Sequence, residues 1–137
     1  MNKNLPVGEV MIKFGNFPVV NERELLRETI EEMNKFRLGI ACVIDKNDKL
    51  IGVLTDGDIR RLILRVQKPI SAIFVDDAIS YSTRNFSNVL EQTSLKNALL
   101  KMEESKIWDL PVLDNNGRLK GLLHLHPALK FVLGLKD

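Results

Sequence analysis

A chain of 137 residues is long enough for one hydrophobic core, provided that both halves contribute to it. With 45% hydrophobic and 28% charged residues it has the composition of a soluble globular protein, and a net charge of +2 without a basic run gives no reason to expect nucleic acid. There is one cysteine, no signal peptide and no long apolar span, so we expect a cytoplasmic protein without an internal disulfide or a membrane segment.

The chain opens with a predicted short turn of helix or bridging segment over 7–11 and a short edge strand over 17–20. Asn21, with Glu24 three residues further on, predicts the start of a helix because this spacing is typical of helix caps. An apolar stripe at helical spacing follows, and Gly39 predicts the end of that helix.

The next segment predicts a hairpin. The apolar runs 40–44 and 50–54 are separated by a tight polar turn, and residues 58–65 then show the pattern of a second helix. Cys42 lies inside the first of these runs, so we expect it in the core and not as a nucleophile.

The second half predicts a similar series of elements. They are a strand over 78–83, a loop over 84–92, a helix that starts at Thr93 or Ser94, a hairpin of 110–113 and 119–123, and a last helix over 127–133.

The two halves are copies of one unit, since residues 26–64 align with residues 95–133 at a constant shift and without a gap. Identical residues include the pairs Leu26 and Leu95, Met33 and Met102, Val43 and Val112, Asp45 and Asp114, Asn47 and Asn116, Gly52 and Gly121. We therefore predict a mixed α/β (α+β) fold of two β-α-β-β-α repeats, 1–66 and 67–137, packed sheet to sheet.

Thr55 and Asp58 lie where the predicted strand 50–54 passes directly into a helix. Free backbone N–H groups at such a junction attract phosphorylated ligands, and a carboxylate can accept hydrogen bonds from a ribose diol. The same two residues also fit a helix cap that binds nothing. Both interpretations stay open at this point.

The repeat, the two hairpins and the segment 54–61 (Leu-Thr-Asp-Gly-Asp-Ile-Arg-Arg) resemble a tandem pair of CBS domains, the Bateman module. With Gly-Leu-Leu-His-Leu-His at 121–126, the chain is most similar to the C-terminal CBS pair of arabinose 5-phosphate isomerases, sugar-phosphate isomerases of the KpsF/GutQ type. A similar pair accompanies some sugar nucleotidyltransferases. The isomerase domain itself is missing, so the chain is either an excised fragment or a free-standing module.

The resemblance implies a non-catalytic regulatory module with a ligand in a cleft between the repeats. The ligand would be AMP, ADP or ATP, or a pathway sugar nucleotide such as CMP-Kdo. The partners would be a second copy of the chain, as a homodimer, and an isomerase domain in cis, without nucleic acid or membrane. By the family pattern Thr55 and Asp58 hold the ribose, Ile40 and Ala41 line the base, and Arg60, Arg61 or a basic residue of the other half face the phosphates.

The second copy departs from this pattern, because His124 replaces Thr55 and Pro127 replaces Asp58. Proline cannot hold a diol, so we do not expect a standard nucleotide site there. His124 and His126 suggest contact with a sugar phosphate, a plain strand end, or zinc, but no nearby Cys or second acidic cluster completes a metal site. We predict no metal.

Two other function classes can be compared with this sequence. One is a dimerisation module with empty clefts, in which Thr55 and Asp58 only cap a helix. The other is an enzyme, but the sequence shows no nucleophile–base pair, no complete metal ligand set and no paired acids in a plausible pocket. The segment 74–93 is longer than the family pattern and is expected to cover or narrow a cleft, and Trp108 is expected in packing or a dimer contact.

Overall fold

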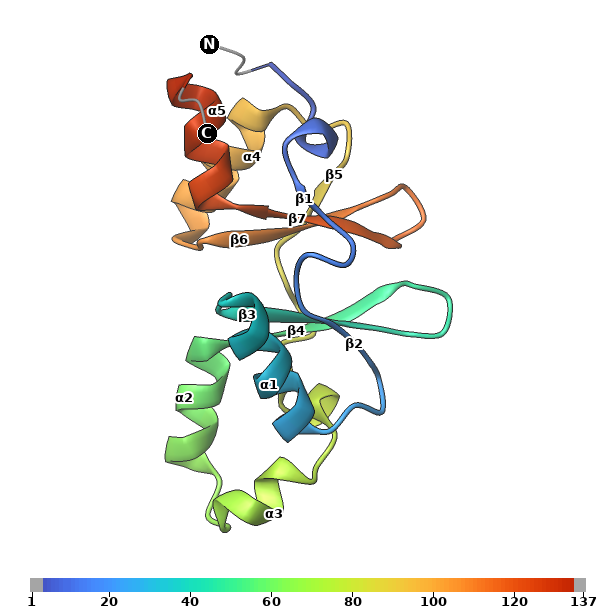
Figure 1. Ribbon diagram of the computed structural model, residues 1–137, viewed down its shortest axis with the longest axis vertical. Coiled ribbons are helices and arrows are strands. Elements are labelled where there is room, and N and C mark those ends of the chain that lie inside the picture. Colours follow the sequence, from blue (N-terminus) through green and yellow to red (C-terminus); the bar gives the residue numbers. More distant parts are fainter. Residues whose placement is uncertain (1–3, 135–137) are drawn as a thin grey trace. The chain divides into compact units, whose positions relative to one another are not determined.

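The computed structural model describes residues 4–134, which fold as two compact units (Figure 1). One unit consists of the N-terminal segment up to Phe14 together with the chain from Ser87 onwards. The other unit is Gly15–Phe86. The compact units therefore divide the chain differently from the sequence repeats 1–66 and 67–137, because the segment before Phe14 packs with the second half.

In the unit Gly15–Phe86 the predicted order of strand, helix, hairpin and helix is confirmed. Strand β2 pairs in parallel with β3 at the edge of a three-stranded sheet, and β3 pairs antiparallel with β4. The elements are β2 (Val19–Asn21), α1 (Leu26–Phe36), β3 (Ile40–Ile44), β4 (Leu50–Thr55), α2 (Asp56–Arg65), α3 (Ile70–Phe74) and the 3-10 helix η2 (Ala78–Tyr81).

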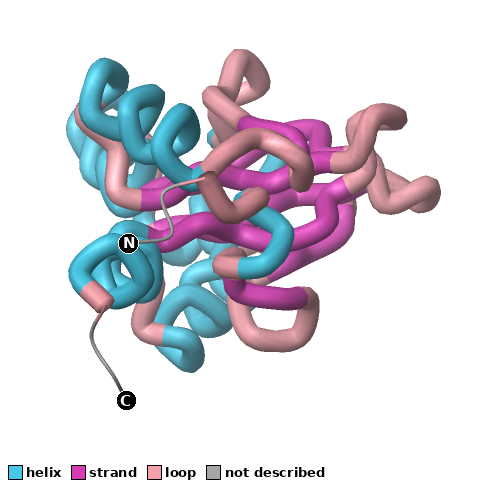
Figure 2. The backbone as a smooth tube through the Cα atoms, turned by 90° about the horizontal axis from the view of Figure 1, so that it is seen from above, coloured by secondary structure: helices cyan, strands magenta, loops and turns pink. Residues whose placement is uncertain are grey.

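The other unit repeats this arrangement and adds one strand from the N-terminal segment. Its sheet has the order β1-β7-β6-β5, with β1 antiparallel to β7 and β5 parallel to β6. The elements are the 3-10 helix η1 (Val7–Glu9), β1 (Ile12–Lys13), β5 (Val89–Leu90), α4 (Leu95–Ser105), β6 (Asp109–Leu113), β7 (Leu119–His124) and α5 (Leu125–Leu133). The predicted α/β fold class is confirmed, and Figure 2 shows the turns that join the helices and strands.

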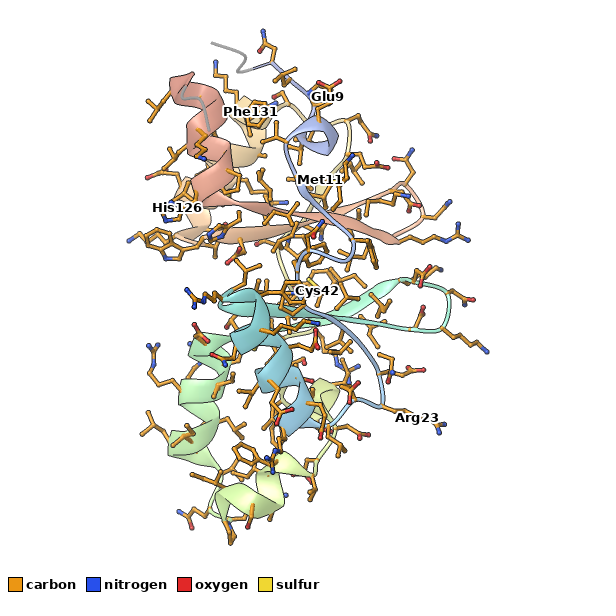
Figure 3. The ribbon with its side chains drawn as sticks, viewed as in Figure 1. Glu9, Met11, Arg23, Cys42, His126 and Phe131 are labelled. Atoms are coloured by element: carbon orange, nitrogen blue, oxygen red, sulfur yellow. The ribbon has the colours of Figure 1, made fainter. Side chains whose placement is uncertain are left out.

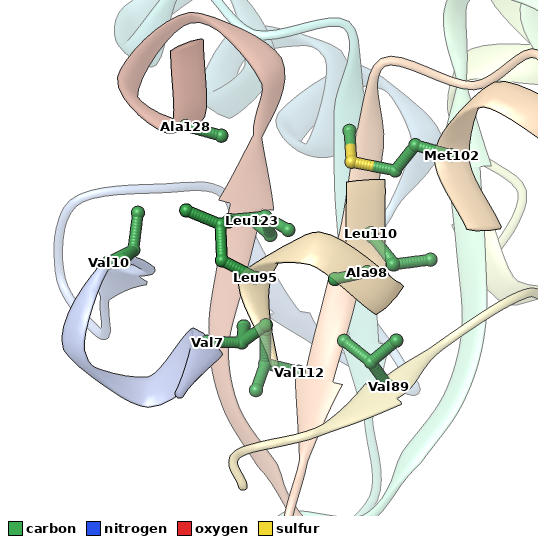
Figure 4. Close-up of a cluster of buried hydrophobic side chains, with 10 residues drawn as sticks. All are labelled: Val7, Val10, Val89, Leu95, Ala98, Met102, Leu110, Val112, Leu123 and Ala128. Atoms are coloured by element: carbon green, nitrogen blue, oxygen red, sulfur yellow. The ribbon is translucent and has the colours of Figure 1, made fainter. Parts of the chain in front are cut away.

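Each unit has its own hydrophobic core between its sheet and its helices. The core of the unit Gly15–Phe86 includes Leu26, Met33, Ala41, Leu54 and Leu62. Figure 4 shows the other core, where η1 and β5 close around α4, β6, β7 and α5 with the buried side chains of Val7, Val10, Val89, Leu95, Ala98, Met102, Leu110, Val112, Leu123 and Ala128. Cys42 is fully buried in β3, which confirms its predicted place in a core.

Two predicted ends of helix α1 were wrong. The helix starts at Leu26, and Asn21 instead accepts a hydrogen bond from the Arg23 amide in a tight turn before it. The helix ends at Phe36, and Arg37 directly after it adopts the left-handed conformation with φ 56°, so Gly39 is not its end. The chain turns at Arg37 because the amide of this residue closes onto the carbonyls of the last helical turn.

The predicted strand 78–83 was also wrong, and the predicted loop 84–92 is interrupted by a two-residue strand. Residues Ala78–Tyr81 form η2, and Thr83 makes only an isolated bridge to Val53 of β4. The strand of this region is β5, whose Val89 is buried and pairs with β6. A two-residue strand leaves no periodic signal in the sequence, so β5 could not be predicted from periodicity. This strand depends on its pairing with β6.

No helix within the described residues is both long and apolar enough to span a membrane.

Candidate functional site

Thr55 lies at the junction of β4 and α2, as predicted, and it caps the helix. Its hydroxyl oxygen accepts a hydrogen bond from the Asp58 amide (3.2 Å), while its own amide donates to Asp58 Oδ2 (2.9 Å). The Thr55 hydroxyl also donates to Asp58 Oδ2 (3.0 Å). The structure thus contains the complete capping box that the sequence allowed.

The second carboxylate oxygen of Asp58 is used differently from the first. Asp58 Oδ1 accepts hydrogen bonds from the Arg61 guanidinium (2.9 Å) and from the Thr83 hydroxyl (3.0 Å). Burial raises the pKa of the Asp58 carboxyl. The hydrogen bonds from Thr55, Arg61 and Thr83 together lower this pKa by more than burial raises it, so the pKa lies below the ordinary value of 3.8. At neutral pH Asp58 is therefore a carboxylate that only accepts hydrogen bonds.

Capping and ligand binding make separate demands on this carboxylate. The cap uses Oδ2, which is tied to Thr55. Oδ1 accepts hydrogen bonds from Arg61 and Thr83, which take no part in the capping box. A ligand hydroxyl can therefore reach Oδ1 by replacing one of them while the cap stays intact.

A polar pocket of about 390 Å³ lies beside Asp58, between α2 and residues 80–83, which comprise the end of η2 and the segment after it. Its polar lining consists of Asp58, Arg61 and Arg65 on α2, and of Ser80, Tyr81, Ser82 and Thr83 opposite them. Arg65 and the hydroxyl residues were missed in the sequence, because 78–83 was interpreted as a strand. The run of four consecutive hydroxyl residues was the available signal.

The other residues predicted for this site do not line the pocket. Ile40 and Ala41 are buried in β3, with 3% and 0% of their surface exposed, and Ile40 pairs with Thr55 across the hairpin. Arg60 is exposed on α2, outside the pocket lining. Of the predicted set, the structure brings Thr55, Asp58 and Arg61 together.

In the other unit His124 occupies the corresponding position between β7 and α5. Its Nδ1 lies 2.7 Å from Oδ1 of Asp109, the residue that pairs with it across the hairpin. Asp109 was missed, although it matches Ile40 in the repeat and its place opposite His124 follows from that match. Figure 3 labels His126 at the start of α5, where its exposed ring lies 5.6 Å from that of His124.

This second cluster differs from the first in chemistry. Pro127 stands in the first turn of α5 at the place of Asp58, and the His124 side chain makes no cap hydrogen bond to the helix. Trp108 is 65% exposed in this unit, so its indole does not pack in the core. Within residues 4–134 there is no group of three or more His, Cys, Asp or Glu side chains that could hold a metal ion.

Comparison with known proteins gives a consistent family. The CBS domain pattern matches residues 7–65 and 75–130. The arabinose 5-phosphate isomerase KdsD of Pseudomonas aeruginosa is 32% identical over 126 residues, which make up 92% of this chain and 37% of that protein. The chain spans 36% to 40% of the length of the first curated relatives that it matches.

Two solved structures show the same fold. The crystal structure of CBSX2, a protein of Arabidopsis thaliana, in complex with AMP matches with a TM-score of 0.81 and 29% identity, covering 94% of this chain and 96% of that one. The CBS domain pair of protein MJ0100, in complex with 5′-methylthioadenosine and S-adenosyl-L-methionine, matches with a TM-score of 0.76 and 21% identity, over 95% and 97% of the two chains.

Proposed function

Because the chain belongs to the CBS domain family, as a tandem pair, we propose that this regulatory module binds an adenosine nucleotide at Thr55 and Asp58. The observation that carries the proposal is the ionised Asp58 carboxylate, fixed beside the first turn of α2 at the edge of a polar pocket. The similarity to CBSX2, whose crystal structure contains AMP, supports an adenosine ligand.

The chemistry of the site fits a nucleoside. A ribose diol donates two hydrogen bonds, and Asp58 Oδ1 is an acceptor whose present partners are the side chains of Arg61 and Thr83. The bound ligand would act by favouring one conformation of the protein, and its effect could not exceed the difference between its binding free energies for the two states.

The similarity to KdsD supports a proposal about the longer protein. We propose that the module controls a sugar-phosphate isomerase domain in the same polypeptide, and that the module itself catalyses nothing. In that setting CMP-Kdo, a sugar nucleotide, is the alternative ligand. Isomerisation of arabinose 5-phosphate by the pure 137-residue chain would contradict the non-catalytic role.

A thermal-shift screen tests the binding proposal with AMP, ADP, ATP, S-adenosylmethionine, CMP and CMP-Kdo. At 100 times its dissociation constant, a ligand stabilises the folded chain by about 2.7 kcal/mol. We expect the shift from AMP to disappear in Asp58→Asn. It should persist in Asp56→Asn, which removes the same charge from an exposed position in the same turn of α2.

Two results would contradict the proposal. An equal shift in the wild type and in Asp58→Asn would remove Asp58 from the site. A screen without any shift, for a chain that is dimeric in solution, would favour the dimerisation module with Thr55 and Asp58 acting only as a cap.

A further inference from the structure

One wall of the polar pocket is a short segment, residues 80–83, which we call the pocket wall. One end of it is fixed by Thr83, whose backbone exchanges hydrogen bonds of 2.8 and 3.0 Å with Val53 of β4. Nearer its other end, the Tyr81 hydroxyl donates a hydrogen bond to Asp76 Oδ2. The pocket wall therefore has two attachments, and the second is to a residue that does not line the pocket.

Asp76 is the centre of this second attachment. The Lys68 ammonium lies 2.6 Å from Asp76 Oδ2, the same oxygen that accepts the Tyr81 hydroxyl. The backbone of Asp76 is fixed as well, because its carbonyl accepts from the Leu26 amide at the start of α1 (2.8 Å) and its amide donates to the Ile73 carbonyl of α3 (3.1 Å). We call Lys68, Asp76 and Tyr81 the anchor cluster. It joins the pocket wall to α1 and to the segment between α2 and α3.

The other unit repeats the backbone arrangement around the anchor cluster, so the counterparts of its residues can be identified. Three backbone contacts recur when the N-terminal segment is shifted by 71 residues (76 − 5). The contacts are Leu26 with Asp76 and Leu95 with Leu5, Leu25 with Asp77 and Ser94 with Pro6, and Val53 with Thr83 and Leu122 with Ile12. By this shift Asp76 corresponds to Leu5, and Tyr81 corresponds to Val10.

These counterparts of the anchor cluster are apolar. Val10 is 6% exposed, and Leu5 packs against the same hydrophobic core. The backbone arrangement therefore forms without a polar side chain at either position. In the same unit Pro127 stands at the place of Asp58. The polar pair thus occurs in the unit that has the Asp58 carboxylate, and apolar packing replaces it in the unit that lacks this acid.

We propose that Asp76 is a positioning residue of the nucleotide site, which through Tyr81 holds the pocket wall at the distance from α2 that nucleotide binding requires. The inference rests on the proposed function, because the nucleotide is placed at Asp58. It adds the residue that controls the geometry of the wall opposite this carboxylate. Asp76 does not line the pocket, so it acts on the ligand through the Tyr81 hydroxyl. Lys68 balances the charge of Asp76 and keeps it ionised as the acceptor.

Two substitutions remove the hydrogen bond from opposite sides. Asp76→Leu introduces the residue type found at the corresponding position of the other unit, and Tyr81→Phe removes only the hydroxyl. We expect each variant to bind AMP roughly three- to ten-fold more weakly in calorimetric titrations. The double variant should bind no more weakly than either single variant, because both changes remove the same bond. Asp77→Leu, the matched control at the exposed neighbouring position, should bind AMP like the wild type.

Three results would overturn the positioning role. The first is an unchanged AMP affinity in Asp76→Leu or Tyr81→Phe. The second is a double variant in which the two losses multiply, and the third is an equal loss in Asp76→Leu and Asp77→Leu. If AMP binding is nevertheless lost in Asp58→Asn, the proposed function still stands, so the two failures can be told apart.

Tyr81 is the only tyrosine of the chain, so the absorbance of tyrosinate reports its ionisation directly. The hydrogen bond to Asp76, together with burial, raises the pKa of Tyr81 above its ordinary value of 10.0. Coupling between two sites is reciprocal, so saturating AMP should raise this pKa further if AMP binding and the bond to Asp76 favour each other. The charged groups around the phenol are Asp76 and Lys68, and across the pocket Asp58, Arg61 and Arg65.

Asp76→Leu is the control for this titration, because the negative charge of AMP can itself raise the pKa of a nearby phenol. The increase caused by AMP should disappear in Asp76→Leu, whereas a direct effect of the AMP charge would persist there. Equal pKa values of Tyr81 with and without AMP in the wild type, or an equal increase in Asp76→Leu, would overturn the coupling.

If no nucleotide binds the wild type, the proposed function fails, and amide hydrogen exchange tests the position of the pocket wall by itself. The amides of Thr83 and Val53, which bond to each other's carbonyls, should exchange faster in Tyr81→Phe than in the wild type. They should exchange at the wild-type rate in Asp77→Leu. Unchanged exchange in Tyr81→Phe would show that the anchor cluster does not hold the pocket wall.

Discussion

Asp58 performs two tasks with its two carboxylate oxygens: Oδ2 completes the cap of α2, and Oδ1 holds Arg61 and Thr83. Since the cap and the pocket share this residue, we expect its loss to affect stability and also the proposed nucleotide binding. For a variant at Asp58, the stability with ligand must therefore be compared with the stability of the same variant without ligand before any change in binding is interpreted.

The lowered pKa of Asp58 predicts how stability depends on pH. Burial alone would raise this pKa, but the hydrogen bonds from Thr55, Arg61 and Thr83 hold the folded value below 3.8. The stabilisation is therefore fully present above the ordinary aspartate pKa and is lost as the pH falls through the lower folded value. Asp76 and Asp114, whose pKa values are lowered by Lys68 and by the Arg118 amide, respectively, contribute in the same direction.

The measurement is urea denaturation of the wild type and Asp58→Asn between pH 2 and pH 7. The stability difference between the two proteins should be constant above about pH 5 and should shrink at lower pH. Asp56→Asn serves as the control, because the Asp56 side chain is exposed and lies outside the capping box. A difference that is independent of pH down to pH 2 would show that Asp58 carries no such stabilisation.

At the scale of elements, Gly52 and Gly121 correspond to each other in the repeat, and each lets a neighbouring segment approach its strand closely. A Cβ on Gly52 would lie 2.9 Å from Ile79 Cδ1 and 3.1 Å from Ser82 Cβ, and a Cβ on Gly121 would lie 2.8 Å from the Ile12 carbonyl oxygen. Gly52 thus lets the pocket wall approach β4, and Gly121 lets β1 approach β7. In each unit a segment from elsewhere in the chain uses the space that glycine leaves.

We expect Gly121→Ala to destabilise the chain by about 1–3 kcal/mol, because the contact is with backbone that cannot move aside easily. Gly8→Ala is the control, since its Cβ would meet the Glu91 carbonyl oxygen at an ordinary 3.4 Å. Thermal denaturation of both variants measures their stabilities relative to the wild type. Equal stability of Gly121→Ala and Gly8→Ala would contradict the close approach of β1 to β7.

Much of the fold could be predicted because its signals are local. Both hairpins and the Thr55–Asp58 cap depend on residues close together in the sequence, and the repeat then transfers the first hairpin to the second half. Arg65 could not be assigned, because the pocket forms only when η2 and Thr83 fold back on β4 and α2. The bond from Thr83 to Asp58 spans 25 positions and has no local signature.

At the scale of the whole molecule, each unit exposes apolar side chains on the helix that follows its hairpin. On α2 these are Ile63 and Leu64, exposed by 59% and 79%, and on α5 they are Phe131 and Leu133, exposed by 43% and 61% (Figure 3 labels Phe131). Clusters of exposed apolar residues mark interaction sites. We propose that these helices pack against a second copy of the chain in a homodimer.

Light scattering coupled to gel filtration tests the homodimer. The wild type should have the mass of two chains, and Leu64→Glu should shift it towards one. Ile70→Glu is the control, because Ile70 is 56% exposed on α3, outside α2 and α5. A monomeric wild type, or equal dissociation by both variants, would contradict this interface.

The central claim is that a nucleotide binds where β4 meets α2. An NMR titration of the chain with AMP tests it most directly, because the amides of both corresponding junctions are observed in one experiment. We predict saturable shifts at Thr55 and Asp58 that vanish in Asp58→Asn. Shifts confined to His124 and Ala128, at the corresponding junction of β7 with α5, or no shifts at saturating AMP, would contradict the account.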